Sequence, residues 1–238
     1  MPSAPPWRVA VVVPARDEAA VLGGCLAAVA RAASRVRPAP VHVIVVADRC
    51  RDGTVAVAAE ALAGTDAAVV RSDAGNVGVA RGVGVATARR LVPHGDARHL
   101  WIATTDADSR VPPDWLRSHI TAAAAGWRAV VGGIDVDDWG PRDRHLGAGL
   151  VRHRQRQAAA GSRPVHGANL GVAAAALDAV GGVPPQVLSE DAALVRVLEA
   201  AGIPVLWAPR LVVRTSARRS PRVPGGFSSL LDRLEVQT

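Results

Sequence analysis

Lysine and tyrosine are missing from this chain of 238 residues, cysteine occurs twice, and aromatic residues make up only 3%. Cys25 and Cys50 offer neither a disulfide framework nor the spacing of a metal-binding motif. No apolar run approaches the roughly 18 residues of a membrane-spanning helix, and the first residues lack the pattern of a signal peptide. We therefore expect a cytoplasmic protein without a transmembrane segment, a result that still allows peripheral contact with a membrane.

The positive charge of the chain comes from arginine alone, which supplies all 28 basic side chains and a net charge of +7. These arginines are scattered, without a long basic run or a basic patch interleaved with aromatic residues. The distribution disfavours nucleic-acid binding. It suits a small phosphorylated ligand, because a guanidinium group binds a diphosphate in a fork geometry.

Val-rich runs alternate with Ala-rich segments along most of the chain, and 49% of its residues are hydrophobic. The runs predict strands over 7–14, 41–47, 67–71, 99–105 and 129–136, and a pair of short strands within 204–214. Helical periodicity predicts helices over 19–33, 115–125 and 173–180, two helices that end at 62 and near 91, and a last helix that begins at 189. Ser189 is predicted to cap the last helix, and Asp52 or Thr54 to cap the helix that ends at 62. The alternation predicts a single α/β domain with a mostly parallel sheet flanked by helices.

Polar turns follow the first strands of this predicted sheet. They contain Arg16 and Glu18, then Asp48, then Asp106. Because right-handed crossovers bring the carboxyl ends of parallel strands to one edge, we expect these side chains to line one ligand crevice.

Two aspartates, Asp106 and Asp108, end the fourth strand abruptly. Carboxylates at a strand end suit a hard cation such as Mg²⁺, which keeps open positions for substrate phosphates. The alternative is that Asp106 caps the following turn while Asp108 is solvated. The glycines at 75, 78, 82 and 84 match neither a dinucleotide fingerprint nor a Walker loop. They are interpreted as packing positions, with Arg81 available to face a phosphate or a base.

The order of these motifs resembles the family 2 glycosyltransferases of GT-A fold, over residues 8–216. On the donor side, the resemblance rests on the segments 14–18, 45–54 and 78–84 and on Asp106-Ala107-Asp108. On the sugar and acceptor side, it rests on Gly167-Ala168-Asn169 and on Glu190-Asp191. The resemblance implies a GT-A domain over 8–216. The proline-rich segment 1–7 before it is expected to be disordered, and the polar, basic segment 217–238 after it to be a tail or a lid.

The resemblance also implies a function, which is metal-assisted transfer of a sugar from a nucleotide-diphosphate sugar to a hydroxyl acceptor, with inversion (hexosyltransferase type). The implied donor-binding residues are Pro14, Arg16, Glu18, Asp48, Arg81, Asp106, Gly167 and Asn169. Mg²⁺ or Mn²⁺ would be held by Asp108 with Asp106. Asp191 would act as the general base, and Glu190 would orient the acceptor or the helix of Asp191.

The sequence departs from the family at two places. Many relatives carry a histidine near the C-terminal end of the domain as a further metal ligand, whereas no histidine follows His166 here, and Arg214, Thr215 and Ser216 occupy that region. The second motif has one acid, Asp48, where many relatives have two. We interpret His166 as a hydrogen-bonded structural histidine. The alternative is that its side chain reaches the donor.

Two other functions stay open. A nucleotidyltransferase shares a similar sheet and acidic metal site, but its glycine-rich basic loop after the first strand has no counterpart in 14–18. A non-catalytic nucleotide-sugar-binding module would not need Asp48, Asp106, Asp108 and Asp191 together.

Overall fold

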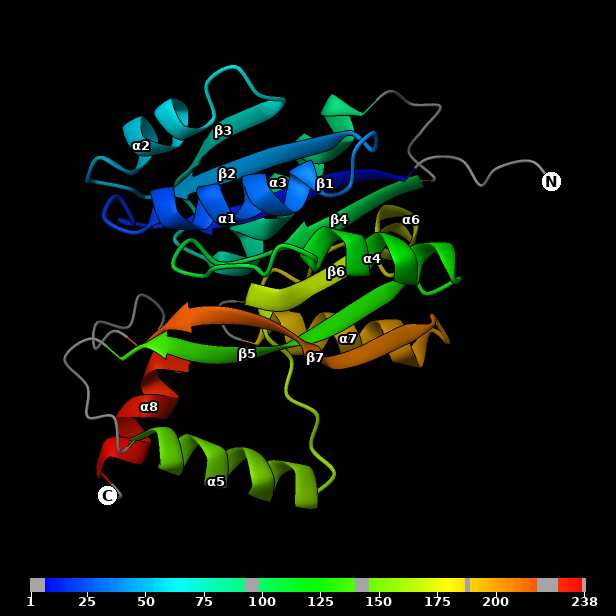
Figure 1. Cartoon of the computed structure of the whole chain (residues 1–238). Coiled ribbons are helices and arrows are strands. Elements are labelled where there is room, and N and C mark those ends of the chain that lie inside the picture. The colour runs from blue at the N-terminus through cyan, green and yellow to red at the C-terminus, as the bar shows by residue number, and fades with distance from the viewer. Residues whose placement is uncertain (1–6, 93–98, 140–145, 187–188, 218–226, 237–238) are drawn as a thin grey trace.

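The computed structural model describes residues 7–92, 99–139, 146–186, 189–217 and 227–236. A seven-stranded sheet in the order β3-β2-β1-β4-β6-β5-β7 forms its centre (Figure 1). The strands are β1 (Arg8–Ala15), β2 (Val41–Asp48), β3 (Ala67–Ser72), β4 (Leu100–Thr104), β5 (Ala129–Asp138), β6 (Leu170–Ala173) and β7 (Val205–Ser216). The helices are α1 (Leu22–Ser34), α2 (Thr54–Ala61), α3 (Val77–Leu91), α4 (Trp115–Ala124), α5 (Leu146–Ala159), α6 (Ala174–Ala179), α7 (Glu190–Ala200) and α8 (Phe227–Val236), with a 3-10 turn at Gly167–Asn169.

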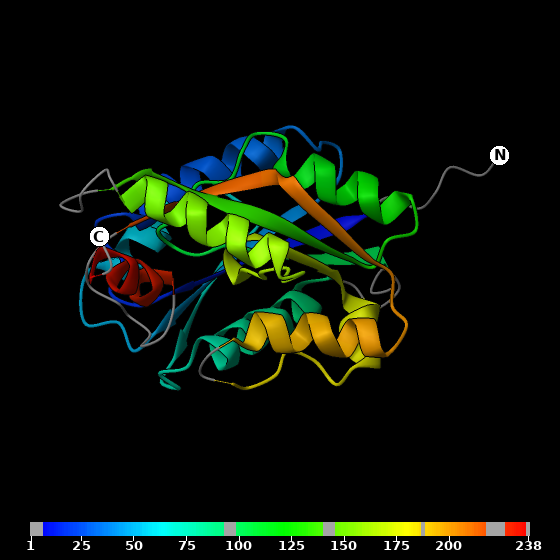
Figure 2. The ribbon, with the colours of Figure 1, turned by 90° about the horizontal axis from the view of Figure 1, so that it is seen from below.

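The sheet is mostly parallel, as predicted. The pairs β1–β2, β2–β3, β1–β4 and β5–β7 are parallel, whereas β6 runs antiparallel to both β4 and β5. Helices α1 and α4 cover one face of the sheet, and α3, α6 and α7 cover the other (Figures 1 and 2). Since β1, β2 and β4 run side by side, their carboxyl ends meet at one edge, on the left in Figure 1.

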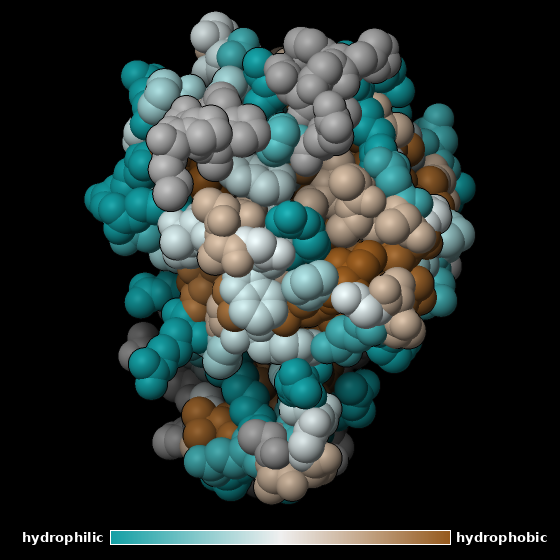
Figure 3. Space-filling model, turned by 90° about the vertical axis from the view of Figure 1, so that its right-hand side faces the viewer, coloured by the Kyte–Doolittle hydropathy of each residue, from teal (hydrophilic) through white to brown (hydrophobic). Residues whose placement is uncertain are grey.

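Burial on both faces explains why the strands read as continuous apolar runs. The five residues Val9 to Val13 of β1 are each fully buried. The opposite side of the molecule, from which these strands start, is shown in Figure 3, where a central apolar area is surrounded by hydrophilic side chains. The acidic strand ends therefore lie on the other side of the molecule.

Two local predictions were wrong. The segment 204–214 forms one strand, β7, whose register against β5 shifts between Gly132 and Gly133. Pro209 lies on β7 at this irregularity and has no N–H to give to the ladder, which explains the apparent break in the sequence pattern. Ser189 does not cap α7, because its left-handed backbone (φ 58°) differs from the extended geometry that a capping side chain needs.

Gly53 occupies the N-cap position of α2, and Asp52, one of the two predicted candidates, supports the start of the helix from the preceding position. Its Oδ1 accepts the Thr54 N–H at 2.9 Å. The Thr54 hydroxyl donates to the same carboxylate and accepts the N–H of Glu18 at 2.7 Å, so that it also ties the first polar turn to α2.

A second, smaller apolar cluster lies where α5 packs against α8, below the sheet in Figure 1. It consists of Val136, Leu146, Leu150, Ala217, Leu231 and Leu234. Residues 227–236 of the predicted tail thus form a helix, while 218–226 and 237–238 lie outside the described residues. Residues 1–6 also lie outside them, and Trp7 packs edge-on against Trp101. Within the described part of the chain, no helix combines the length and apolar character needed to cross a membrane.

Candidate functional site

Asp48 ends β2 and is 5% exposed. Its Oδ1 accepts the N–H of Gly75 at 3.0 Å, and its Oδ2 accepts the N–H of Asn76 at 2.9 Å. Gly75 has a φ of 63°, which glycine adopts without strain. The Asn76 side chain then caps α3 by accepting the Val79 N–H at 3.1 Å. The carboxylate of Asp48 therefore fixes the turn that starts α3.

The turn after β1 is tied to its neighbour in the same way. Pro14 and Arg16 are half-buried at the end of β1, and Glu18 is 5% exposed. The Glu18 carbonyl accepts the first N–H groups of α1. The Oδ1 of Asp17 accepts the N–H of Arg51 at 2.7 Å. As expected, the structure brings this turn and the Asp48 turn to the same edge of the sheet.

Arg81 lies at the centre of the site and is 5% exposed. Its Nη1 pairs with Oε1 of Glu190, and its Nη2 lies 2.7 Å from Oδ1 of Asp106. A side chain at Gly167 would collide with the guanidinium group, so the backbone of the 3-10 turn has to approach it closely. Arg81, expected to face a phosphate or a base, thus links the acidic strand end of β4 to the first residue of α7.

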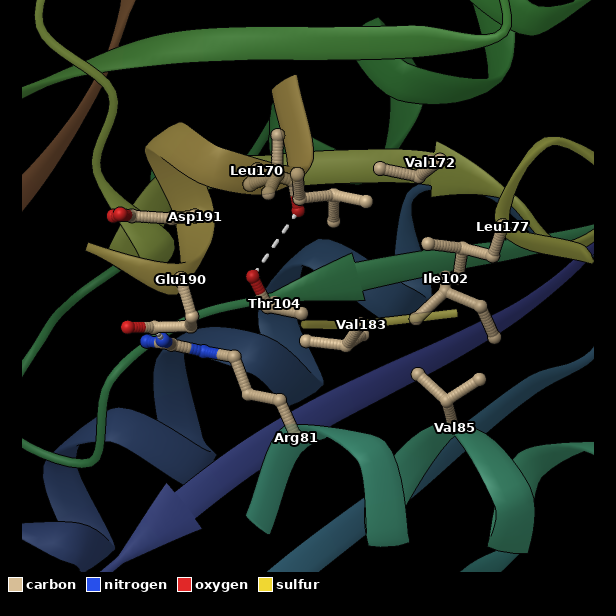
Figure 4. Close-up of a pocket in the computed structure, with 11 residues that line it drawn as sticks. Arg81, Val85, Ile102, Thr104, Leu170, Val172, Leu177, Val183, Glu190 and Asp191 are labelled. Atoms are coloured by element: carbon tan, nitrogen blue, oxygen red, sulfur yellow. Dashed lines mark hydrogen bonds and ion pairs between the residues drawn. The ribbon is translucent and has the colours of Figure 1, made fainter. Parts of the chain in front are cut away.

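The acidic pair at the start of α7 divides into an inner and an outer residue (Figure 4). Glu190 is 4% exposed and its carboxylate is paired with the Arg81 guanidinium, whereas Asp191 is half-buried. Oδ2 of Asp191 accepts the Gly167 N–H at 2.6 Å, and Oδ1 accepts the Ala192 N–H at 2.7 Å. These two N–H groups hold the Asp191 carboxylate in place at the start of α7.

The Asn169 side chain forms hydrogen bonds within the protein through both its carboxamide oxygen and its carboxamide nitrogen. Its Oδ1 accepts the Trp115 indole N–H at 2.9 Å, and its Nδ2 donates to the carbonyls of Gly133 and Leu211, both at 2.7 Å. The residue is fully buried. Its carboxamide therefore holds the 3-10 turn that carries Gly167, and only its backbone is left for the donor contact that the sequence predicts.

The two aspartates of the turn after β4 are both partly accessible. Asp108 is half-buried, and the Asp106 side chain is 41% exposed. Two carboxylates in one turn fit a hard divalent cation, because such ions take oxygen ligands and leave positions for phosphate. Cys25 lies beneath the turn, where its thiol donates to the Asp106 carbonyl at 3.4 Å and burial raises its pKa. A buried thiol of this kind is unreactive and contributes to packing.

A second group of potential ligands, Asp17, Cys50 and Asp52, has ligand atoms within 4.8 Å of one another. Asp52 is already engaged by Thr54 and by the N–H of Ala19, and its bond from the Thr54 hydroxyl lowers the pKa of its carboxyl. This group therefore stabilises the turns and is not a preferred metal site.

His166 lies close to Asp191, on the segment before the 3-10 turn. Burial lowers the pKa of its imidazole, an effect that the charge of Asp191 opposes. Behind the Arg81–Glu190 pair, an apolar hollow is lined by Val85, Ile102, Leu170, Val172, Leu177, Val183 and Leu194 (Figure 4). Such a lining does not suit a sugar or a diphosphate, so the polar side chains at the carboxyl edge of the sheet form the candidate site.

Comparison with known proteins identifies the family and the fold of the chain. A family model described as "Glycosyltransferase like family 2" matches residues 5–225. No curated protein matches the chain by sequence. Similar solved structures include TarS 1–349 of S. aureus in complex with UDP-GlcNAc, with a TM-score of 0.67, 12% identity and coverage of 97% of this chain and 66% of that one.

Two further structures are similar. The mannosyltransferase PcManGT of Pyrobaculum calidifontis, in complex with GDP-Man and Mn²⁺, has a TM-score of 0.65, 18% identity and coverage of 94% of this chain and 60% of that one. Glucosyl-3-phosphoglycerate synthase of Mycobacterium tuberculosis, in complex with Mn²⁺, UDP and phosphoglyceric acid, has a TM-score of 0.60, 16% identity and coverage of 97% and 75%. The chain spans less than two thirds of the length of TarS 1–349 and PcManGT, and at these identities the likeness establishes the fold.

Proposed function

The chain belongs to the family 2 glycosyltransferases, and we propose that it transfers a sugar from a nucleotide-diphosphate sugar to a hydroxyl acceptor with inversion at the anomeric carbon. The observation that carries this proposal is that Arg81 joins the turn of Asp106 and Asp108 to the start of α7, by pairing with Asp106 and with Glu190, while Asp191 holds the Gly167 N–H. Structural neighbours with UDP-GlcNAc, GDP-Man or UDP bound support a donor of this class.

On this proposal, the nucleotide lies along the ends of β1 and β2, beside Pro14, Arg16, Glu18 and Asp48. Asp108, with Asp106, would hold Mg²⁺ or Mn²⁺, and neighbours with Mn²⁺ bound support a divalent metal. When bound, such an ion neutralises the charge that develops on the nucleotide diphosphate as it leaves. Gly167 and the backbone of Asn169 would border the sugar.

Asp191 is proposed as the general base. Its carboxylate is held by two N–H groups and remains partly accessible, so it can accept the proton of an acceptor hydroxyl. The oxygen of that hydroxyl attacks the anomeric carbon as the bond to the diphosphate breaks, which inverts the configuration. Glu190 is engaged by Arg81 and is proposed to position α7.

Measuring the release of nucleoside diphosphate from UDP-, GDP- and dTDP-sugars, with a panel of small hydroxyl acceptors, tests the proposal. We expect release from one donor class that requires a divalent metal and is lost in Asp108→Ala. The anomeric configuration of the product, read by NMR, should be opposite to that of the donor. Release of pyrophosphate from a nucleoside triphosphate would favour the nucleotidyltransferase, and metal-dependent binding without any turnover would favour the binding module.

A further inference from the structure

The turn that carries Asp108 is fastened to β7 by main-chain hydrogen bonds. Arg110 donates its N–H to the Arg214 carbonyl at 2.7 Å, and Arg214 donates its N–H to the Arg110 carbonyl at 3.1 Å. These two bonds do not depend on side chains. They place the next residue of β7, Thr215, beside the aspartate turn regardless of what its side chain is.

Alternation along β7 decides which side chain faces Asp108. Val213 and Thr215 are 0% and 7% exposed, whereas Arg214 between them is exposed. Since successive side chains of a strand point to opposite faces, Thr215 faces the metal turn and Arg214 faces away from it. Arg214 is thus directed away from Asp108, and the side chain of β7 that faces this aspartate is a neutral hydroxyl.

Three oxygen atoms from Asp108, Ser109 and Thr215 form a compact group. Thr215 Oγ1 lies 3.4 Å from Asp108 Oδ1 and 3.0 Å from Ser109 Oγ, which itself lies 3.5 Å from Asp108 Oδ1. In an octahedral magnesium site with ligands at roughly 2.1 Å, neighbouring ligand oxygens are about 3 Å apart. The spacing of this group is therefore close to that of adjacent ligands on one ion.

The Oδ1 of Asp106 lies 2.7 Å from the Arg81 guanidinium, so this oxygen is engaged by a cation of the protein itself. We propose that Thr215 supplies a neutral hydroxyl ligand to the divalent metal held by Asp108, and that Ser109 orients this hydroxyl. This inference rests on the proposed function. The Thr215 hydroxyl has two lone pairs and one proton, so it can accept from Ser109, bind the metal and still donate to a carboxylate or a phosphate.

The chemistry of this ligand set predicts metal selectivity. Carboxylates and hydroxyls are hard oxygen ligands, which suit Mg²⁺ as well as Mn²⁺, whereas an imidazole ligand favours later transition metals. No histidine follows His166 in the chain. The site should therefore accept Mg²⁺ readily, and Thr215→His should shift its preference toward Mn²⁺ and Co²⁺.

The test measures Mn²⁺ binding by paramagnetic resonance and calorimetry, with Mn²⁺ alone and with Mn²⁺ plus UDP or GDP. Thr215→Val removes the hydroxyl at nearly constant volume and should weaken binding by about 10-fold or more, since even outer-shell partners of a metal are worth roughly 10–100-fold. Thr215→Ser should bind like the wild type. Ser216→Ala, on the neighbouring residue of β7, is the matched control and should leave binding unchanged.

Two results would overturn the inference. One is wild-type Mn²⁺ affinity in Thr215→Val with an unchanged thermal melting curve. The other is an unchanged ratio of Mg²⁺ to Mn²⁺ affinity in a folded Thr215→His, which also covers the case in which the valine variant does not fold. If the wild type itself binds no metal with any nucleotide, the proposed function fails first, so the two failures are distinguishable.

Discussion

Two ends of the crevice hold their carboxylates by different means. At the nucleotide end, Asp48 accepts two main-chain N–H groups from Gly75 and Asn76. At the reaction end, Asp106 and Glu190 are joined by the buried guanidinium of Arg81. Main-chain bonds survive substitution of the residues that donate them, whereas a buried ion pair fails when either side chain is removed. The reaction end should therefore be the more sensitive to mutation.

The largest expected effect concerns the reaction end itself. Asp191→Asn keeps the shape of the side chain and an oxygen for the Gly167 N–H, but it cannot take up a proton. General-base catalysis contributes about 10²–10⁴-fold, so kcat for sugar transfer should fall by that factor while donor affinity stays within a few-fold. Steady-state kinetics and donor calorimetry measure the two quantities. Asp178→Asn, an exposed aspartate, is the control; equal losses of kcat in both variants would contradict the role of Asp191.

The next effect compares a buried with an exposed ion pair. Arg81→Ala leaves the Glu190 carboxylate buried without its partner, which should lower the free energy of unfolding by about 3–5 kcal/mol. The pair Arg35–Asp114 is about half exposed, with side-chain exposures of 53% and 49%, so Arg35→Ala should cost less than about 1 kcal/mol. Urea unfolding of both variants gives the difference. Similar costs would mean that Arg81 is not the structural centre of the reaction end.

A third prediction concerns the dependence of folding stability on pH. His119 is fully buried, packs edge-on against Trp115, and burial lowers the pKa of its imidazole to about 3. The unfolded chain therefore binds this proton first as the pH falls. Stability should be complete above about pH 6.5 and fall by about 1.4 kcal/mol per pH unit between pH 6.5 and 3.

Comparing the unfolding free energies of the wild type and His119→Leu between pH 7 and 5 isolates this contribution, because leucine cannot titrate. The unfolding free energy of the wild type minus that of His119→Leu should decrease as the pH falls, because only the wild type loses stability through this imidazole. Parallel curves would show that His119 is not the source of the acid sensitivity.

The smallest effect is expected at the nucleotide end. Asp48→Asn keeps one acceptor oxygen and loses one of the two main-chain bonds, at a cost of about 1.5 kcal/mol in unfolding free energy. On the proposed function, donor affinity should fall as well. Urea unfolding and calorimetry are the measurements, with the exposed Asp66→Asn as control. A cost as large as that of Arg81→Ala would remove the difference between the two ends.

The same contrast explains what could be predicted from the sequence. The parallel sheet, the site edge, Asp48 and the two aspartates after β4 follow from local patterns, because each is an apolar run that ends in a polar turn. The pairing of Arg81 with Glu190 joins residues 109 apart, and that of Thr215 with Asp108 joins residues 107 apart. No spacing rule gives such contacts.

The contacts that the sequence did not predict and the two local errors have similar causes. Asn169 carries a motif that resembles a donor-binding strand, and the partners that use its carboxamide come from α4, β5 and β7. The left-handed backbone of Ser189 depends on how the preceding loop enters α7, and Pro209 interrupts the pattern of β7 without ending the strand. Only the packed structure contains this information.

The measurement that tests the central claim most directly is calorimetric titration of the wild type and Asp108→Ala with UDP-, GDP- and dTDP-sugars, with and without Mn²⁺. We predict that one donor class binds the wild type only when the metal is present, and that Asp108→Ala abolishes this binding without loss of folding. Failure of every nucleotide sugar to bind the folded wild type under either condition would contradict the assignment of the crevice as a donor site.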